Sequence, residues 1–278
     1  MAWPKIKNII ILILLGTNLC LLAFAVSRGI GDRQQQEQAR ANAISFLQEQ
    51  GIEMDEELVP KTMELQPQVV RRDAEQECVL AAALLDGEVS VEARGAEVYR
   101  YYNQNGSVQF HSNGEFSARF SGDGIPVGEM ELEEHGRQLL ERLEFRGELL
   151  RMEQEGENYA LTYREFWKEM PLLNCQATLR YEKGNLVGIT AGRRLAGEPE
   201  VDNSAQQITV ATALMKFYTG MKAPGDVYTQ ITGITPGYVV SSTLSETMPL
   251  VPVWHISTDV GTFQLDITTG TPSRISGS

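Results

Sequence analysis

The pattern of apolar and polar positions divides the chain into a short apolar run near the N-terminus and a long part with mixed periodicity. Residues 9–26 carry no charged side chain, and a run of about 18 apolar residues just reaches across the hydrocarbon core of a bilayer. Lys5 and Lys7 precede the run, and positive residues on that side favour a cytoplasmic N-terminus. The pattern predicts a cytoplasmic tail and transmembrane helix over 1–28, with the rest of the chain outside the cell.

A cleaved signal peptide is the alternative interpretation of the same segment. Ala23-Phe24-Ala25 supplies the small residues that a signal-peptide cleavage site needs. The apolar run is longer than the usual core of a signal peptide, which favours a membrane anchor that stays attached.

Beyond the span, helical patterns alternate with strand patterns. Apolar residues at helical spacing predict helices from Asp32 to Gln50, from about Glu131 to Gly147, and from Asn203 or Ser204 to Gly220. Each helix is followed by short apolar runs that are separated by turn residues such as Asn105-Gly106. We therefore predict an α+β fold in which antiparallel sheets are each packed by a helix.

The first predicted strand outside the membrane is the apolar run over 79–85, which ends at Asp86-Gly87, a strong hairpin signal. Turn-forming residues are also concentrated from Ser121 to Pro126, and they mark a boundary between domains. We expect one external α+β domain over 29–125 and a second over 126–278.

The composition and motifs argue against several functions. The net charge is -13 and no basic stripe is present, so a nucleic-acid partner is disfavoured. The histidines, His111, His135 and His255, fall in three separate segments. Neither a zinc-peptidase motif, nor a nucleophile elbow, nor a phosphate-binding glycine loop occurs in the sequence. We expect no enzymatic activity, no cofactor and no metal.

The three cysteines do not have zinc-ligand spacing. Cys20 lies inside the predicted span, whereas Cys78 and Cys175 lie outside it. We expect the latter two to be unpaired, buried thiols, although a disulfide between them stays open because sequence alone does not show whether they approach each other.

Three residues interrupt the apolar span: Gly16, Thr17 and Asn18. Small residues let membrane helices approach closely, and an amide can form a hydrogen bond between helices. These residues are the candidate partner-binding site, with a tolerated polar position as the alternative.

The two ends of the chain resemble a known family. Near the C-terminus, a strand with Trp254 is followed by a turn, a second strand and a closing turn with Asp266, Thr269 and Gly270, which resembles the end of a PepSY-like module. At the N-terminus, Trp3, Lys5 and Lys7 directly precede the span. The whole layout resembles YycI-like proteins. 

The resemblance implies a non-catalytic, membrane-anchored regulator. Such a protein pairs with a YycH-like partner and restrains a sensor histidine kinase of the YycG/WalK type through membrane helices, and this kinase system controls cell-wall metabolism. Two other classes stay open: an external PepSY-like module that inhibits a peptidase or binds a wall component, and a wall enzyme with an unrecognised site.

Overall fold

The computed structural model describes residues 32–63, 65–95, 97–222, 228–241 and 247–275. Within these ranges the chain has a mixed α+β fold, in agreement with the predicted class. The helices are residues 32–49, α2 (Ala74–Leu84), α3 (Leu132–Glu141) and α4 (Val210–Lys222), with a 3-10 turn, η1, at Glu56–Leu58. The strands are β1 (Glu53–Met54), β2 (Gln68–Arg71), β3 (Ser90–Ala93), β4 (Tyr99–Asn103), β5 (Gly106–Phe110), β6 (Glu115–Phe120), β7 (Ile125–Pro126), β8 (Gly147–Glu155), β9 (Asn158–Trp167), β10 (Met170–Glu182), β11 (Asn185–Arg193), β12 (Pro199–Val201), β13 (Gln230–Val240), β14 (Thr247–Thr258), β15 (Gly261–Asp266) and β16 (Pro272–Arg274).

One supersecondary unit recurs through the described ranges. A helix is followed by a meander of antiparallel strands in α2–β3–β4–β5–β6, in α3–β8–β9–β10–β11 and in α4–β13–β14–β15–β16. The sequence predicted this repeated order, although it placed the first helix of the series at Asp32 rather than at Ala74.

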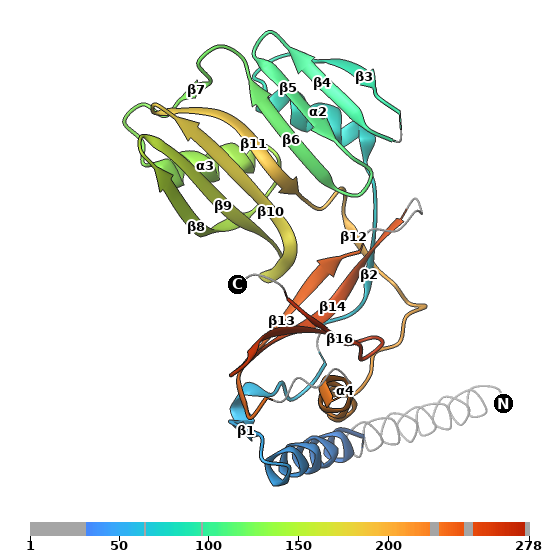
Figure 1. Cartoon of the computed structure of the whole chain (residues 1–278). Helices are drawn as coiled ribbons and strands as arrows, with labels where there is room; N and C mark the ends of the chain where they lie inside the picture. Colours follow the sequence, from blue (N-terminus) through green and yellow to red (C-terminus); the bar gives the residue numbers. More distant parts are fainter. Residues whose placement is uncertain (1–31, 64, 96, 223–227, 242–246, 276–278) are drawn as a thin grey trace, which may run out of the picture.

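The first two units form one sheet, which we call the upper sheet (Figure 1). Its strands follow the order β8-β9-β10-β11-β6-β5-β4-β3, because β6 and β11 pair in antiparallel fashion. Helices α2 and α3 cover the same side of this sheet (Figure 1). Their Leu80, Leu84, Leu139 and Leu140 share a hydrophobic cluster with inward-facing strand residues such as Tyr163.

The third unit forms the lower sheet, which is completed by β2 on the edge of β14 and by β12 beside β2. The upper and lower sheets join where β10 pairs in parallel with β13 at Leu172 and Tyr238. Asn174 strengthens this junction, because its side-chain amide donates to the carbonyl of Val240 at 2.8 Å and accepts from the Val240 N–H at 2.9 Å. The β1–β13 pair is also parallel, so the described sheets are not purely antiparallel as the sequence predicted.

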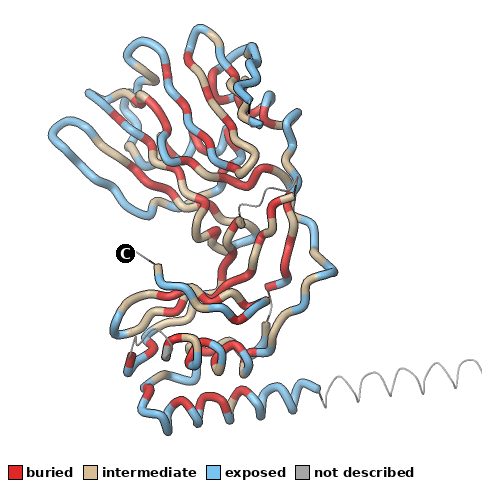
Figure 2. Tube along the Cα trace, turned by 45° about the vertical axis from the view of Figure 1, so that its right-hand side comes forward, coloured by how far each residue is buried: buried red, intermediate tan, exposed pale blue. Residues whose placement is uncertain are grey.

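The helix over 32–49 packs against the third unit rather than the first (Figure 1). Ala43, Ile44 and Leu47 are buried in the same hydrophobic cluster as residues of α4. On the same helix, the buried Arg40 donates hydrogen bonds to the carbonyls of Val59 at 2.9 Å and Pro60 at 3.2 Å. The start of this helix is exposed, and buried positions recur along its second half (Figure 2).

The predicted strand over 79–85 is wrong, because this segment belongs to helix α2. The carboxylate of Asp73 accepts the Gln76 N–H at 2.9 Å and caps the helix, and alanines in its second half favour helix. The run looked uniformly apolar, yet Val79 is exposed while Leu80 is buried. Asp86-Gly87 therefore ends a helix instead of turning a hairpin.

Helix α4 begins at Val210, later than the predicted cap at Asn203 or Ser204. The Asp202 carboxylate accepts the Ser204 N–H at 2.9 Å and its hydroxyl at 2.6 Å, which makes a side-chain turn outside the helix. Thr209 stands before the first helical residue, and its hydroxyl accepts the Thr212 N–H at 3.3 Å.

The buried side chains form two clusters that do not divide at residue 125. One cluster combines residues 43–70 with residues 172–267, and the other lies within 80–189. The N-terminal and C-terminal parts of the external chain therefore share a core. The predicted domains 29–125 and 126–278 are defined as units that fold independently. Independent folding is a separate property from the sharing of a core, so this division stays a prediction.

The closing turn at Asp266 to Gly270 has a clear physical basis. One carboxylate oxygen of Asp266 accepts the backbone N–H groups of Thr268 at 2.7 Å and Thr269 at 3.2 Å. Gly270 adopts a φ of 72°, and a Cβ there would lie 2.0 Å from the Lys216 side chain. Lys216 is held in place because its ammonium donates to the Thr269 carbonyl. The turn therefore fixes the end of the lower sheet on helix α4.

We expect Gly270→Ala to lower the free energy of unfolding by about 1–2 kcal/mol from backbone strain alone, with a further loss from the contact with Lys216. Gly184→Ala is the matched control, since Gly184 has a φ of 78° but nothing within 4 Å of an added Cβ. Chemical unfolding of both variants measures the difference. Equal losses would mean that Lys216 moves aside freely.

Candidate functional site

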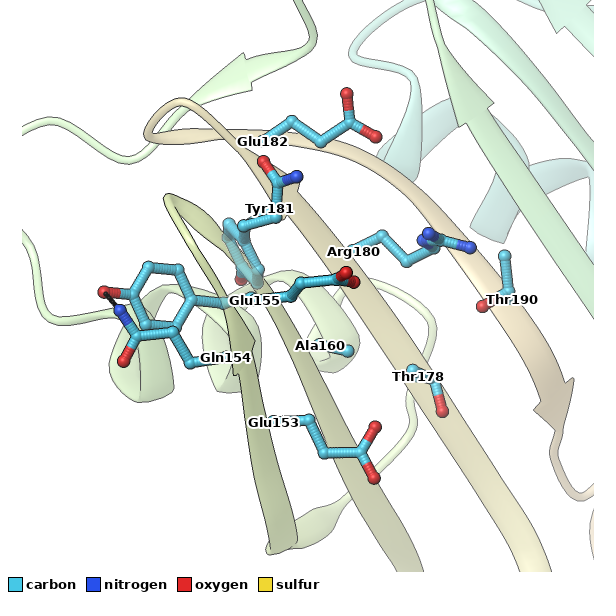
Figure 3. Close-up of a pocket in the computed structure, with 11 residues that line it drawn as sticks. Glu153, Gln154, Glu155, Ala160, Thr178, Arg180, Tyr181, Glu182 and Thr190 are labelled. Atoms are coloured by element: carbon cyan, nitrogen blue, oxygen red, sulfur yellow. Dashed lines mark hydrogen bonds between the residues drawn. The ribbon is translucent and has the colours of Figure 1, made fainter.

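The upper sheet has one face without a covering helix in the described part of the chain, and we call it the open face. Along β10, Ala177, Leu179 and Tyr181 are buried on the helix side, whereas Thr178 and Arg180 alternate with them. Figure 3 shows Thr178 and Arg180 on β10 and Thr190 on the neighbouring β11, all on one side of the sheet. This alternation makes the open face polar.

The strand register places two arginines in one row across the open face. Arg180 on β10 pairs with Gly188 on β11, and Gly188 in turn pairs with Arg119 on β6. The row continues to Ser107 on β5 and Tyr102 on β4. Strands lie roughly 4.8 Å apart, so the backbones of the two arginines are separated by about twice that distance, with a glycine and no side chain between them.

A second row consists mainly of hydroxyl and amide side chains. Thr162, Thr178 and Thr190 lie opposite one another on β9, β10 and β11, and the first two hydroxyls are 2.9 Å apart. On β5 and β4, Gln109 pairs with Arg100. The second row therefore offers hydrogen-bond donors and acceptors rather than apolar contacts, except at Thr162, which is buried.

Charge is distributed unevenly over the open face. One hollow of about 880 Å³ is lined by Arg94, Arg100, Arg119 and Arg180 among other residues. A smaller hollow of about 350 Å³ lies at the β8–β9 end, where Glu153 and Glu155 line it (Figure 3). The two hollows share Arg180, Glu182 and Thr190. The open face thus has a basic half and an acidic half on a chain whose net charge is -13.

Part of the basic half is neutralised within the protein. Glu92 on β3 lies 3.3 Å from Arg94 and 3.5 Å from Arg100, and all three side chains are solvent-accessible. Arg100 also lies over the ring of Tyr102, 5.2 Å from its centroid. Exposed ion pairs of this kind are weak, so a ligand that carries negative charge can exchange with Glu92 at low free-energy cost.

The arrangement of the open face suits binding of an extended polar chain across the strands. Its groups are guanidinium, hydroxyl, amide and carboxylate, which can position a ligand through hydrogen bonds and charge. This site could not be predicted from the sequence, since the strand alternation predicts which residues point outward but not which strands lie side by side.

The histidines lie apart in the structure. His135 on α3 has its Nδ1 3.1 Å from the Tyr181 hydroxyl, and burial lowers the pKa of this imidazole. His111 contacts Gln109 at 3.3 Å, and burial followed by the charge of Arg164 lowers the pKa of His255 on β14. Among the described residues no group of three or more His, Cys, Asp and Glu side chains is placed to hold a metal ion. The expected lack of enzymatic activity stays a prediction.

Cys78 and Cys175 are both free. Cys175 is fully buried and burial raises the pKa of its thiol, as expected for a small core residue. Cys78 lies on the exposed side of α2, so its predicted burial is wrong.

The predicted membrane site lies outside the described residues. This applies to Gly16, Thr17 and Asn18, to the whole span over 9–26, and to Cys20. No helix in the described ranges is both long enough and apolar enough to cross a bilayer.

Comparison with known proteins gives no family assignment. No protein-family model matches the sequence, and no significant match is found among curated proteins. Among solved structures, the chain is similar to an uncharacterized protein from Eubacterium rectale, with a TM-score of 0.41, 11% identity, and coverage of 76% of this chain and 86% of that one. It is also similar to the Bacillus megaterium YpeB C-terminal domain, with a TM-score of 0.38, 13% identity, and coverage of 74% of this chain and 100% of that one. Both TM-scores are below 0.5, so neither similarity establishes a shared fold or a function.

Proposed function

We propose that this chain is a membrane-anchored regulator that restrains a sensor histidine kinase of the YycG/WalK type, together with a YycH-like partner. Residues 1–28 form a cytoplasmic tail and one helix that spans the cell membrane, and the external part has PepSY-like modules. The proposed action is binding rather than catalysis. 

One observation supports this proposal above the others. The helix over 32–49 follows the predicted span directly in sequence, and it packs on α4 through Ala43, Ile44 and Leu47. Phe46 adds an edge-to-face contact with Tyr218 at 5.7 Å, and the Tyr218 hydroxyl donates to Gln50 at 3.0 Å. Because these contacts fix the helix over 32–49 on α4, an event at the external modules would reach the point in the sequence where the predicted span ends.

Contact with the kinase or the partner protein is proposed to involve Gly16, Thr17 and Asn18. We expect Asn18→Leu to weaken pairing of the spans about threefold to thirtyfold, since an interhelical hydrogen bond is worth about 0.6–2 kcal/mol in a membrane. Gly16→Ile should weaken pairing through steric clash. A reporter of helix pairing in membranes, read beside kinase output in cells, measures both effects.

Leu14→Ile is the matched control, because it changes a wholly apolar position of the same span. Normal pairing and kinase output in both the Asn18 and Gly16 variants would contradict the proposed membrane contact.

The open face favours a second candidate function, in which the external part is a binding module for a peptidase or a wall component. An unrelated transmembrane helix in place of residues 1–28 separates the two candidates. Regulation that survives this exchange, but is lost in an Arg119→Ser and Arg180→Ser double variant, would favour the binding module. Loss of regulation on exchange of the span would favour the membrane contact.

A further inference from the structure

A cavity of about 830 Å³ lies on the helix side of the upper sheet, away from the open face. It is lined by the start of α2, the turn after α3, the end of β9 and the segment over 194–199. Two of its lining residues, Glu165 and Arg194, are charged side chains that are each only 4% exposed. Ligand sites in proteins commonly have volumes of this size and contain a few polar groups in fixed positions.

The backbone of the 194–199 segment is held firmly on several sides. The Arg194 N–H donates to the Gly114 carbonyl at 3.0 Å, and the Asp73 N–H donates to the Ala196 carbonyl at 2.9 Å. The Leu195 N–H donates to the Glu165 carboxylate at 2.9 Å. Arg194 therefore enters the cavity from a fixed position.

The Arg194 guanidinium is buried and forms no ion pair with the described residues, although Glu165, Glu77 and Glu144 act on it from a distance. Its Nε has no hydrogen-bond partner, and no carboxylate oxygen of the described residues lies within the 4.0 Å of an ion pair with it. Its Cζ lies over the ring of Phe110, 5.8 Å from the ring centroid. An arginine stays charged in proteins, and a buried charge without a partner is strongly unfavourable.

Neighbouring carboxylates do not supply the missing partner. Both oxygens of Glu77 are bound by Arg72, at 2.7 and 2.8 Å. Glu144 accepts a hydrogen bond from Gln76. For Glu165, burial raises the pKa to about 7, against the opposing influence of the Leu195 N–H and Arg194. The cavity thus contains a cation whose surroundings call for one further anion.

We propose that this cavity binds the C-terminal carboxylate of a short peptide, with Arg194 as its counter-ion. A guanidinium holds a planar carboxylate through two parallel hydrogen bonds. Phe166 and Trp167 line the same cavity and offer apolar surface for a side chain of the peptide. Besides Arg194, two cations line the cavity, Arg146 and Lys168, and they are offset by the carboxylates of Glu141, Glu144 and Glu198. This balance disfavours a doubly charged phosphate more than a singly charged carboxylate.

Calorimetric titration of the full chain in detergent micelles tests the ligand class. The probes are N-acetyl-alanyl-phenylalanine, its C-terminal amide, and inorganic phosphate. We expect the free acid to bind at least tenfold more tightly than the amide, and more tightly than phosphate. Equal binding of acid and amide, tighter binding of phosphate, or no binding of the acid would overturn the proposal.

Arg194→Met tests whether Arg194 is the counter-ion of the bound carboxylate. We expect it to weaken binding of the acid by about tenfold to a hundredfold, since a hydrogen bond to a charged group is worth about 1.5–3 kcal/mol. The same variant should raise the urea midpoint of the unliganded chain, because it removes an unpaired buried charge. A lowered midpoint would mean that Arg194 is structural and that its partner lies within the fold.

Arg193→Gln is the matched control. Arg193 is adjacent in sequence, but its Nε donates to the Asn113 carbonyl at 3.3 Å and it does not line the cavity. Binding of the acid by this variant should match that of the unmodified chain. A loss equal to that of Arg194→Met would also overturn the proposal.

The pH dependence of binding of the peptide acid tests the role of Arg194 separately. The groups that act on Glu165 directly are Arg194, the Leu195 N–H and the Cys175 thiol, whose pKa is raised well above its usual value by burial. The other charged groups that line the same cavity are Arg146, Lys168, Glu141, Glu144 and Glu198. Between pH 6 and pH 8 Glu165 gains its negative charge and competes for Arg194, so the acid should bind more weakly at pH 8. Glu165→Gln should remove this difference, and a difference that persists would contradict the assigned role of Arg194.

Discussion

Glu77→Gln is expected to lower the free energy of unfolding by about 3 kcal/mol, because removal of one partner leaves the other charge of a buried ion pair uncompensated. The Glu77 side chain is 1% exposed and that of Arg72 is 13% exposed. Their contact is bidentate, with Nε to Oε1 at 2.7 Å and Nη2 to Oε2 at 2.8 Å. Bidentate arginine–carboxylate pairs are among the strong hydrogen-bonded contacts of proteins.

The position of Arg72 increases the expected loss. It lies between β2 of the lower sheet and α2 of the upper sheet, and its Nη1 donates to the Glu97 carbonyl at 2.6 Å. The guanidinium also lies over the ring of Tyr99 at 4.9 Å. Without Glu77, the same arginine would have to keep these contacts with its charge unpaired.

Urea unfolding of the full chain in detergent, followed by circular dichroism, measures the effect. Glu134→Gln is the matched control, because Glu134 forms a bidentate pair with the Nε and Nη2 of Arg137 on the exposed side of α3. Exposed pairs contribute little, so the control should not change stability beyond experimental error. A similar small effect for Glu77→Gln would mean that water reaches Arg72 and replaces the carboxylate.

Sequence patterns predicted the elements that depend on interactions between residues close together in the sequence. The hairpins around Asn105-Gly106 and Lys183-Gly184-Asn185 agree with the structure, because turn residues act over a few positions. Helix α3 begins close to its predicted start at Glu131, but its predicted end near Gly147 is wrong. The helix ends at Glu141, Glu144 adopts a φ of 55°, and Gly147 already begins β8. Helix α2 was missed because its alanine-rich sequence lacks a clear apolar stripe. Its cap at Asp73 was the signal that could have corrected this error.

Contacts between distant segments could not be predicted from the pattern. The packing of helix 32–49 on α4, and the parallel contact of Leu172 with Tyr238, join residues that are far apart in the sequence. The same limit applies to the candidate site, since Arg119 and Arg180 become neighbours only through the pairing of β6 with β11. The membrane residues Gly16, Thr17 and Asn18 stay a prediction.

Glu165→Gln is expected to stabilise the chain at alkaline pH and to leave it unchanged in acid. Burial raises the pKa of this carboxyl group from its usual 4.5 to about 7, with the Leu195 N–H and Arg194 acting in the opposite direction. Each pKa unit corresponds to about 1.4 kcal/mol, so ionisation of Glu165 destabilises the folded chain by about 3 kcal/mol. A glutamine keeps the shape of the protonated acid and its acceptor for the Leu195 N–H, but it does not ionise.

Glu165 has a higher pKa in the folded chain than in the unfolded chain, and this difference sets the direction of the pH effect on stability. The folded chain holds its proton more tightly than the unfolded chain, so the contribution of Glu165 to stability is fully present below pH 4.5 and is lost as the pH rises through 7. The difference in unfolding free energy between the variant and the unmodified chain should therefore grow from close to zero at pH 4.5 to about 3 kcal/mol at pH 8. Urea unfolding of both full-length chains across this range measures it. Glu153→Gln, which replaces an exposed carboxylate of the open face, should show no such growth. A constant difference for Glu165→Gln from pH 4.5 to pH 8 would mean that Glu165 ionises as readily in the folded chain as in the unfolded one.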